Sequence, residues 1–250
     1  MSKVSVLILA YNEEDRIADC INSVKSFADE IIVIDDFSTD RTAEISDRLG
    51  AKVITRALDG NFSAQKNFAI DQARFDWIFS IDSDERVTEK LSQHIRSIVD
   101  ENDQKFAYRI PRLSFFFDQP LKHGGWFPDY VTRLMPKNGT HVDGIVHEKF
   151  IHNCIEKDFP RDEYLIHYTY KNWEHYFNKF NTYTTLAAKK MFDQGKSANV
   201  IDIIFRPIWA WFRMYILRFG FLDGKIGFFL AAFHFFYTMV KYVKLYYLRK

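Results

Sequence analysis

The sequence predicts an α/β fold built on a parallel, doubly wound sheet with helices on both faces. Short β-branched and aliphatic runs at residues 4–9, 31–34 and 53–54 alternate with segments in which apolar residues recur at helical spacing. Residues 77–81 supply a fourth run, which stops at an acidic segment. Because strands and helices alternate, we expect parallel strands joined by crossover helices, with ligands bound at the carboxyl ends of the strands.

Helices are indicated between these strands and through the rest of the chain. Apolar residues recur three or four positions apart after the first strand, as at Ile17, Ile21 and Val24. Beyond residue 105 the pattern is less regular. The further elements expected are a helix over 63–73, short strands over 106–112, 131–135 and 164–168, an amphipathic helix over 172–192, and two helices over 200–248 that break near Gly220 and Gly224.

The composition suits one α/β domain, alone or with an appendage. The chain has 250 residues, of which 47% are hydrophobic and 27% charged, enough to bury a substantial core. Its two cysteines, Cys20 and Cys154, are too few and too scattered for a disulfide framework or a zinc site. The N-terminus carries one basic residue and runs directly into a strand, unlike a cleavable signal, so we expect a cytoplasmic protein.

Residues 206–250 form a basic, aromatic tail. They hold eight Lys or Arg against one acid, Asp223, a net charge of +7, which leaves −6 on the rest of a chain of net charge +1. With aromatic residues at 17% of the chain, this asymmetry favours an anionic membrane surface over nucleic acid as the partner. The longest uncharged stretch, residues 226–240, is shorter than the about 20 residues that span a bilayer. We therefore expect helices that lie in the membrane interface, the alternative being a buried helical pair that closes the core.

The acidic segment after the fourth strand is the first candidate for chemistry. Asp82 and Asp84 flank Ser83, and in an extended segment residues two apart share a face, so both carboxylates can converge on one hard cation such as Mg²⁺ or Mn²⁺. Such a cation can offset the negative charge that develops on a departing diphosphate. Asp-x-Asp tripeptides are frequent in surface loops, but the position of this one at the end of a buried strand favours a metal site.

Polar residues also follow the first two strands. Asn12 and Glu13 come after the first strand, and Asp35 and Asp36 come after the second. Acidic and amide side chains at neighbouring strand ends can accept hydrogen bonds from a base N–H and from ribose hydroxyls. Asp40 instead resembles an N-cap of the helix that follows it. Asp35 and Asp36 are harder to explain as caps, because adjacent carboxylates repel each other unless a donor faces them.

Four segments together resemble the family 2 inverting glycosyltransferases, in the order and spacing that the family shows. The segments are residues 4–14 (VSVLILAYNEE), 33–40 (VIDDFSTD), 65–67 (QKN) and 82–84 (DSD). This resemblance covers about the first 100 residues. A narrower resemblance, to the bacterial lipopolysaccharide-core β-glucosyltransferases, is carried by residues 124–129 (GGWFPD), 144–148 (GIVHE) and 221–228 (FLDGKIGF).

The resemblance implies a GT-A fold, which is Rossmann-like, with a mixed but mainly parallel sheet. It implies inverting, metal-dependent transfer of a hexose from a nucleotide-sugar such as UDP-glucose to a lipid-linked saccharide such as the lipopolysaccharide core. Asp84 would bind Mg²⁺ or Mn²⁺ together with Asp82, which would also face the ribose or the donor sugar. Lys66 would lie near the diphosphate, the alternative being a solvated helix charge. The nucleotide-sugar contacts implied are Ala10, Tyr11, Asn12, Glu13, Asp35, Asp36, Lys66, Asp82 and Ser83.

Inversion by direct displacement needs a group that takes the proton of the acceptor hydroxyl. The candidates are Glu148, Asp129 and His147, and Glu148 is preferred because Gly144 opens a loop that can approach a substrate. His147 could instead contact the diphosphate or the cation, and the pair could equally be a surface pair at the start of a strand. Trp126 offers an apolar face to an acceptor sugar, although a lone Trp is more often part of a core.

The expected organisation is a transferase domain over residues 1–195, with a nucleotide-sugar half (1–100) and an acceptor half (101–170), followed by membrane-associating helices over 196–250. The protein would lie on the inner face of the bacterial cytoplasmic membrane. The Gln-x-x-Arg-Trp motif of processive polysaccharide synthases is absent, which favours a single addition. Polyprenyl phosphate is the main alternative acceptor, and a non-catalytic membrane scaffold is the alternative of another class. A nucleotidyltransferase is disfavoured, because no glycine precedes Gly50 to form a triphosphate-binding loop.

Overall fold

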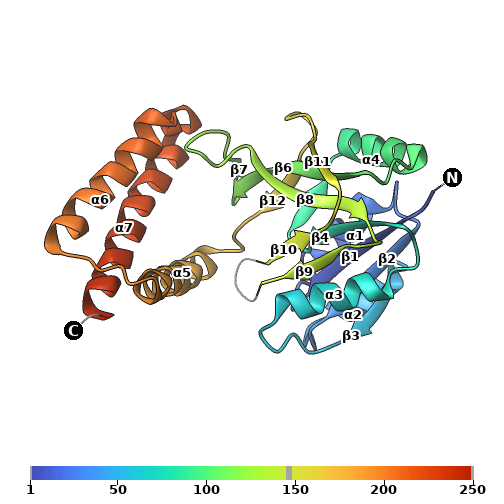
Figure 1. Cartoon of the computed structure of the whole chain (residues 1–250). Helices are drawn as coiled ribbons and strands as arrows, with labels where there is room; N and C mark the ends of the chain where they lie inside the picture. Colours follow the sequence, from blue (N-terminus) through green and yellow to red (C-terminus); the bar gives the residue numbers. More distant parts are fainter. Residues whose placement is uncertain (1, 145–147, 249–250) are drawn as a thin grey trace. The chain divides into compact units, whose positions relative to one another are not determined.

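The computed structural model of the chain describes residues 2–144 and 148–248. They form two compact units, each assembled from two stretches of sequence (Figure 1). The N-terminal unit comprises Met1–Arg112 and Asp129–His167, and the C-terminal unit comprises Leu113–Pro128 and Tyr168–Lys250.

A mixed sheet forms the centre of the N-terminal unit, and its order is β3-β2-β1-β4-β8-β6-β12-β5. The first four strands in this order are parallel, whereas β8 runs antiparallel to both β4 and β6. Two further strands, β7 and β11, pair with β6, and β9 and β10 form a separate hairpin. The bounds are β1 (Val4–Ala10), β2 (Glu30–Asp35), β3 (Lys52–Thr55), β4 (Trp77–Asp82), β5 (Glu85–Val87), β6 (Phe106–Phe116), β7 (Gln119–Pro120), β8 (Asp129–Pro136), β9 (His141–Asp143), β10 (Lys149–Ile151), β11 (Ile155–Asp158) and β12 (Leu165–Tyr168).

Helices cover both faces of the parallel strands. Alternate side chains of β1 point to opposite faces, so Val6 and Ile8 join one apolar cluster while Leu7 joins another. The first cluster packs under α1, α2 and α4, and the second packs under α3 and the β9–β10 hairpin. The helix bounds are α1 (Ile17–Val24), α2 (Thr42–Arg48), α3 (Phe62–Gln72) and α4 (Glu89–Glu101). The predicted α/β class, mainly parallel and covered on both faces, is confirmed.

The C-terminal unit is mostly helical. It contains α5 (Trp173–Asp193), α6 (Val200–Phe212) and α7 (Gly224–Leu248), with a π-helical turn (Arg213–Leu217) and a 3-10 turn (Gly220–Asp223) between the last two. The predicted break near Gly220 and Gly224 is confirmed. The first turn of α7 approaches the 3-10 turn so closely that residue 227 must be glycine: a Cβ on Gly227 would lie 1.8 Å from the carbonyl oxygen of Gly220.

Helix α5 packs against α7, although the sequence placed the start of the tail later, at residue 196. The rings of Tyr176 and Phe233 lie 5.2 Å apart, and Ala188 on α5 shares a buried cluster with Tyr242 and Leu245 on α7. The sequence assigned α5 to the transferase domain because its apolar positions gave no sign of which unit they face. The functional division at residue 195 stays a prediction.

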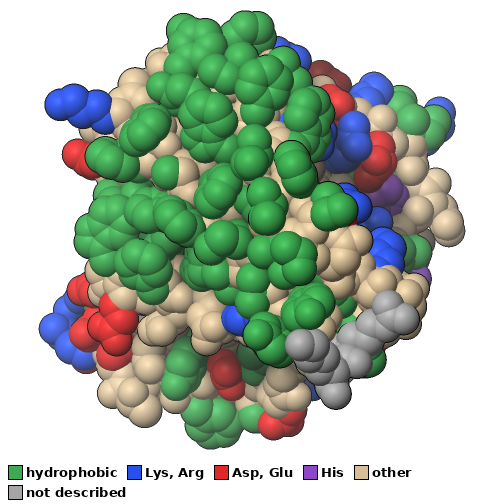
Figure 2. Space-filling model, turned by 90° about the vertical axis from the view of Figure 1, so that its left-hand side faces the viewer, with side chains coloured by type: hydrophobic (Ala, Val, Ile, Leu, Met, Phe, Trp, Pro, Cys, Tyr) green, Lys and Arg blue, Asp and Glu red, His purple; other side chains and the backbone are tan. Residues whose placement is uncertain are grey.

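The helical hairpin of the C-terminal unit exposes many apolar side chains. Figure 2 shows them as a dense patch on one face of the molecule. Members of this patch, here called the apolar face, lie on α6, α7 and the turns between them and include Ile201, Ile204, Phe205, Ile208, Trp209, Phe212, Leu217, Phe219, Leu222, Phe229 and Phe236. Within the described residues, one helical stretch, Gly220–Leu248, has the length and composition to cross a membrane.

Candidate functional site

The carboxyl ends of β1, β2 and β4 meet at one edge of the sheet. In the strand register Ala10 lies opposite Asp35, and Leu9 lies opposite Asp82. The polar segments that follow these three strands are therefore neighbours, as the sequence predicted. This is the edge at which open α/β sheets bind ligands.

Asn12 ties the segment after β1 to the segment after β2. Its backbone N–H donates to Ser38 Oγ at 2.9 Å, and its side-chain oxygen accepts from the backbone N–H of Thr39 at 2.8 Å. Tyr11 and Phe37, beside these residues in sequence, are 57% and 62% exposed. An exposed aromatic ring held on a fixed loop can stack on a flat nucleobase.

Asp35 carries a buried oxygen that lacks a donor. Its side chain is 2% exposed, and Oδ2 accepts from the backbone N–H of Ser38 at 3.0 Å. Oδ1 is also buried and receives no hydrogen bond from the described part of the chain. Because buried acceptors are normally satisfied, this oxygen is suited to a hydroxyl or N–H of a ligand. Asp36 differs, since its Oδ1 accepts from the backbone N–H of Leu58 at 2.8 Å.

Asp40 bonds to the start of α2, but it is not the N-cap residue that the sequence predicted, because Arg41 holds that position. Its Oδ1 accepts from the backbone N–H of Thr42, the first residue of α2, at 2.9 Å. Its Oδ2 accepts from the backbone N–H of Glu14 at 3.1 Å. Asp40 thus joins the start of α2 to the segment after β1 and is occupied by structural bonds.

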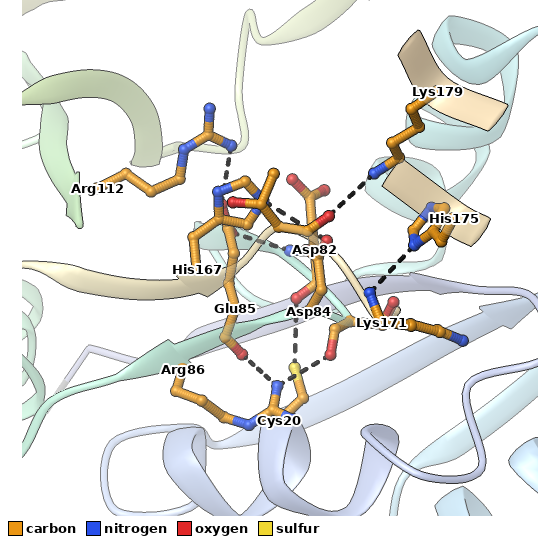
Figure 3. Close-up of polar contacts among 12 residues, drawn as sticks. Cys20, Asp82, Asp84, Glu85, Arg86, Arg112, His167, Lys171, His175 and Lys179 are labelled. Atoms are coloured by element: carbon orange, nitrogen blue, oxygen red, sulfur yellow. Dashed lines mark hydrogen bonds and ion pairs between the residues drawn. The ribbon is translucent and has the colours of Figure 1, made fainter. Parts of the chain in front are cut away.

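The acidic segment after β4 forms a turn, so the prediction that Asp82 and Asp84 share a face of one extended segment is wrong. β4 ends at Asp82, Ser83 and Asp84 form the turn, and β5 begins at Glu85. The two carboxylates have different partners, and Figure 3 shows Asp84 beside His167. Asp82 Oδ2 accepts from Arg133 at 2.5 Å, whereas Asp84 Oδ2 lies 3.5 Å from Nε2 of His167 on β12.

A buried ion network holds Asp82. Arg133 also donates to Glu85 at 2.6 Å, and Glu85, which is fully buried, accepts from Arg112 at 3.2 Å. Burial raises the pKa of Asp82, but the positive charges of Arg133 and Lys66 outweigh burial and hold it well below its usual range. Burial lowers the pKa of Arg133, but the Asp82 and Glu85 carboxylates outweigh burial and raise it. Both groups therefore stay ionised.

The side chain of Arg86 donates hydrogen bonds to the backbone of the acidic turn. Its guanidinium donates to the backbone carbonyl of Ser83 at 2.9 Å and to that of Glu85 at 2.7 Å, with Arg86 and Glu85 labelled in Figure 3. It also donates to the backbone carbonyl of Arg16 at 2.7 Å. The buried thiol of Cys20 faces the Asp82 carbonyl at 3.5 Å. Two of these contacts restrict the turn that carries Asp84, and the third ties Arg86 to the segment before α1.

Asp84 and His167 fit a divalent cation site. The 3.5 Å between their nearest atoms is short enough for both to face one ion with bonds of about 2.1 Å. The described residues contain no group of three or more His, Cys, Asp or Glu arranged around one point. Mg²⁺ typically takes one or two protein ligands and completes its shell with substrate phosphates and water, so two protein ligands suffice. Asp82 is less suited than Asp84 to bind the cation, because its Oδ2 already accepts a hydrogen bond from Arg133.

Lys66 and Glu148, both predicted site residues, form an ion pair. Lys66 lies on α3, and Glu148 is the residue directly before β10. Lys66 Nζ donates to Glu148 Oε1 at 3.1 Å. Burial raises the pKa of Glu148, but the Lys66 ammonium outweighs burial and lowers it below its ordinary value. Asn67 next to Lys66 fixes the neighbouring hairpin, because it exchanges two hydrogen bonds with the backbone of Val142 on β9.

The other candidate bases and the predicted acceptor residue lie in different settings. Asp129, at the start of β8, accepts from Nε and Nη2 of Arg112 at 3.0 and 2.6 Å, so it serves the ion network. His147 lies outside the described residues. Trp126 belongs to the C-terminal unit, where it lines a cavity.

Sequence reasoning missed three residues of the site: His167, Arg133 and Glu85. Each is brought to the acidic turn by a strand, and two of them come from beyond residue 130. No local motif marks them, since a lone His or Arg in a strand has many roles. Glu85 offered one signal, because it directly follows the Asp-x-Asp segment and its carboxylate accepts from the Asp82 backbone at 3.1 Å.

Comparison with known proteins gives consistent matches. The family described as Glycosyl transferase family 2 matches residues 5–187. An uncharacterized glycosyltransferase of Rickettsia prowazekii is 33% identical over 240 residues, covering 91% of this chain and 81% of the relative. The lipopolysaccharide core biosynthesis glycosyltransferase LpsC of Rhizobium meliloti is 27% identical over 237 residues, covering 88% and 82%. The crystal structure of S. aureus TarS resembles the fold with a TM-score of 0.51 at 17% identity, covering 74% of this chain and 39% of TarS.

Proposed function

Because the chain belongs to glycosyl transferase family 2, we propose that it transfers a hexose, with inversion, from a nucleotide-sugar such as UDP-glucose to a lipid-linked saccharide. One observation carries this proposal. The N-terminal unit holds Asp35 at the end of β2 and the pair of Asp84 and His167 beyond the end of β4, where the carboxyl ends of its parallel strands meet. A buried acceptor oxygen on Asp35 suits the nucleoside, and the pair of Asp84 and His167 suits a cation.

Each side chain has a role in the proposed transfer. Asp35 accepts from the nucleoside, Tyr11 offers its exposed ring to the base, and Asp84 with His167 would hold Mg²⁺ or Mn²⁺. When bound, the cation offsets the charge of the leaving diphosphate. Lys66 adds a positive charge, whose field lowers the pKa of Asp82. Glu148 accepts the proton of the acceptor hydroxyl as that oxygen bonds to C1 of the hexose and the C1–O bond to the diphosphate breaks.

Release of nucleotide from a donor panel tests this proposal. Purified protein with Mn²⁺ is incubated with UDP-, GDP- and dTDP-sugars, and free nucleotide is measured. We expect turnover with UDP-hexoses, since water can replace a missing acceptor at a low rate. No release from any donor, together with no UDP binding by calorimetry, would contradict transfer and favour the non-catalytic scaffold.

The acceptor we propose is a saccharide of the lipopolysaccharide core. Two observations support it: LpsC of Rhizobium meliloti is named for that pathway, and the C-terminal unit carries a broad apolar face suited to a lipid surface. Polyprenyl phosphate is the second candidate, since it too would require a protein that reaches the bilayer. Both acceptors place the protein on the inner face of the bacterial cytoplasmic membrane.

We propose that the helical hairpin lies in the membrane interface. Although Gly220–Leu248 has the length to cross a bilayer, α7 packs along both α5 and α6, and Lys241 and Lys244 lie near its end. Lys244 donates to the Asn181 side chain at 2.8 Å and to Thr184 at 2.9 Å, which holds α7 on the polar helix α5. A helix packed in this way places its apolar side in the membrane interface, and its charged side remains in contact with water.

Vesicle sedimentation checks this placement. Phosphatidylglycerol vesicles should sediment the full chain better than neutral phosphatidylcholine vesicles, because each Lys or Arg near an anionic surface contributes about 1 kcal/mol. The aromatic side chains add a component that salt does not screen, so high salt should release only part of the protein. Equal binding to both vesicles would reject the electrostatic part, and resistance to alkaline extraction from membranes would favour a spanning helix.

A further inference from the structure

The C-terminal unit contains a cavity of about 650 Å³ that the proposed transfer does not use. Four cationic side chains line it: Arg206 on α6, Arg213 and Arg218 at the turn, and Lys241 on α7. Its other walls are mostly aromatic and apolar, with His234 and Thr238 as further polar residues, and no Asp or Glu is among the described residues that line it. A basic, aromatic cavity of this kind is suited to a ligand that is both anionic and partly apolar.

The positive charge of the cavity is mostly uncompensated. Arg206 pairs with Asp202, its Nε lying 2.6 Å from Oδ1. For Arg213, Arg218 and Lys241 the described part of the chain offers no acidic partner within ion-pair distance. Burial and the neighbouring Arg206 lower the pKa of Lys241, as expected for an ammonium group that lacks a counter-charge. An anion in the cavity would relieve this repulsion.

The loop at residues 121–128 holds Arg218 in position. The backbone N–H of Gly124 donates to the Arg218 carbonyl at 2.9 Å, and a Cβ added to Gly125 would lie only 2.2 Å from Arg218 Nη1. The guanidinium can lie there only because residue 125 is glycine. Asp223 anchors the same loop, since its Oδ1 lies 2.6 Å from His123 Nδ1. The glycine pair and Asp223, both parts of motifs noted in the sequence, thus shape one wall of the cavity.

The cavity opens beside the apolar face. Trp209, which lines it, is 57% exposed and belongs to that face, as do Phe205 and Phe212 on the same helix. A ligand with an anionic head in the cavity could therefore extend an apolar chain along α6. This continuity distinguishes a lipid from a small soluble anion.

We propose that the cavity binds the phosphate group of an anionic lipid, with the acyl chains lying along the apolar face. Arg213 and Arg218 donate to the phosphate oxygens, for which the planar guanidinium fork is well suited, and Lys241 adds a third charge. The aromatic walls contact the polar part of the head group. The inference deepens the membrane association proposed above and rests on it, and it does not depend on the identity of the sugar donor.

Two double variants test the site. R213Q/R218Q removes two charges from the cavity, and K189Q/K225Q removes two charges from exposed positions outside it. The probes are dihexanoyl phosphatidylglycerol, a soluble short-chain lipid, dihexanoyl phosphatidylcholine, and inorganic phosphate, each measured by calorimetry on the full chain. Charge-assisted hydrogen bonds of this kind correspond to about 10- to 100-fold in affinity, so R213Q/R218Q should lose that much for phosphatidylglycerol. K189Q/K225Q should lose less than about threefold.

A third variant tests geometry without a change of charge. G125A displaces the Arg218 guanidinium, so it should weaken phosphatidylglycerol binding while keeping the net charge, and it serves as the decisive variant if R213Q/R218Q fails to fold by circular dichroism. Equal losses in the two double variants would indicate diffuse attraction and overturn the proposal. So would equal affinity for phosphatidylcholine, or binding of inorganic phosphate alone. Donor hydrolysis measured in parallel separates the two proposals, because its absence in wild type contradicts transfer but leaves lipid binding measurable.

Discussion

Replacing Asp84 with alanine is expected to abolish sugar transfer at every Mn²⁺ concentration. Asp84 faces His167 on a turn whose position is restricted by two hydrogen bonds from Arg86 to the carbonyls of Ser83 and Glu85. Loss of charge stabilisation on the leaving diphosphate removes several kcal/mol, which corresponds to a fall of about 10³-fold or more. Nucleotide release from UDP-sugar, measured over a range of Mn²⁺, gives the result.

The His167→Gln variant separates the metal role from a general loss of function. Since Asp84 remains, this variant should need more Mn²⁺ for half-maximal rate and bind Mn²⁺ more weakly by electron paramagnetic resonance. Glu101→Ala, an exposed carboxylate at the end of α4, is the matched control and should be unchanged. Near-normal activity of Asp84→Ala, or of wild type in excess EDTA, would end the metal hypothesis.

The location of the site could be predicted from sequence because it depends on local patterns. The buried runs at β1, β2 and β4 fix strands whose carboxyl ends meet, and the polar residues after each run are then neighbours. Asp35 illustrates this: two adjacent carboxylates at a strand end required donors, and the structure provides one for each while leaving Asp35 Oδ1 open.

The partners within the site could not be predicted, because they come from distant strands. Asp82 and Asp84 looked equivalent in sequence, yet the turn directs one to Arg133 and the other to His167. An extended segment and a turn of two residues cannot be distinguished by the string Asp-Ser-Asp alone. The pairing of Lys66 with Glu148 also joins α3 to the residue before β10, and nothing in either motif indicates it.

In the C-terminal unit, too, contacts between residues distant in sequence could not be predicted. Its helices and their glycine break follow from periodicity, but the cavity is formed by residues that lie far apart in sequence, from Gly124 to Lys241. The sequence showed an excess of positive charge in the tail without showing that four of the cations line one cavity.

Glu148→Gln is expected to lower transfer by about 10²- to 10⁴-fold, the usual cost of removing a general base, while UDP binding is retained. The ion pair with Lys66 keeps the carboxylate ionised and thus able to accept a proton. Glu101→Gln is the matched control. A loss of only two- or threefold would move the role to Asp129 or His147, of which Asp129 is already bound to Arg112.

The pH dependence of transfer tests the same role through Lys66. A general base works when deprotonated, so the rate falls as the pH drops through the pKa of Glu148. In wild type the Lys66 charge outweighs burial and holds the pKa of Glu148 below its ordinary value, so the acidic limb should lie at lower pH than for an unperturbed glutamate. In Lys66→Met the charge that lowers the pKa of Glu148 is lost while burial and the Asp82 carboxylate still raise it, so the limb should move to higher pH, in addition to any loss of diphosphate binding seen in KM. If the acidic limb of kcat stays in place while KM rises, Lys66 serves the diphosphate only, and Glu148 is not the group that sets the limb.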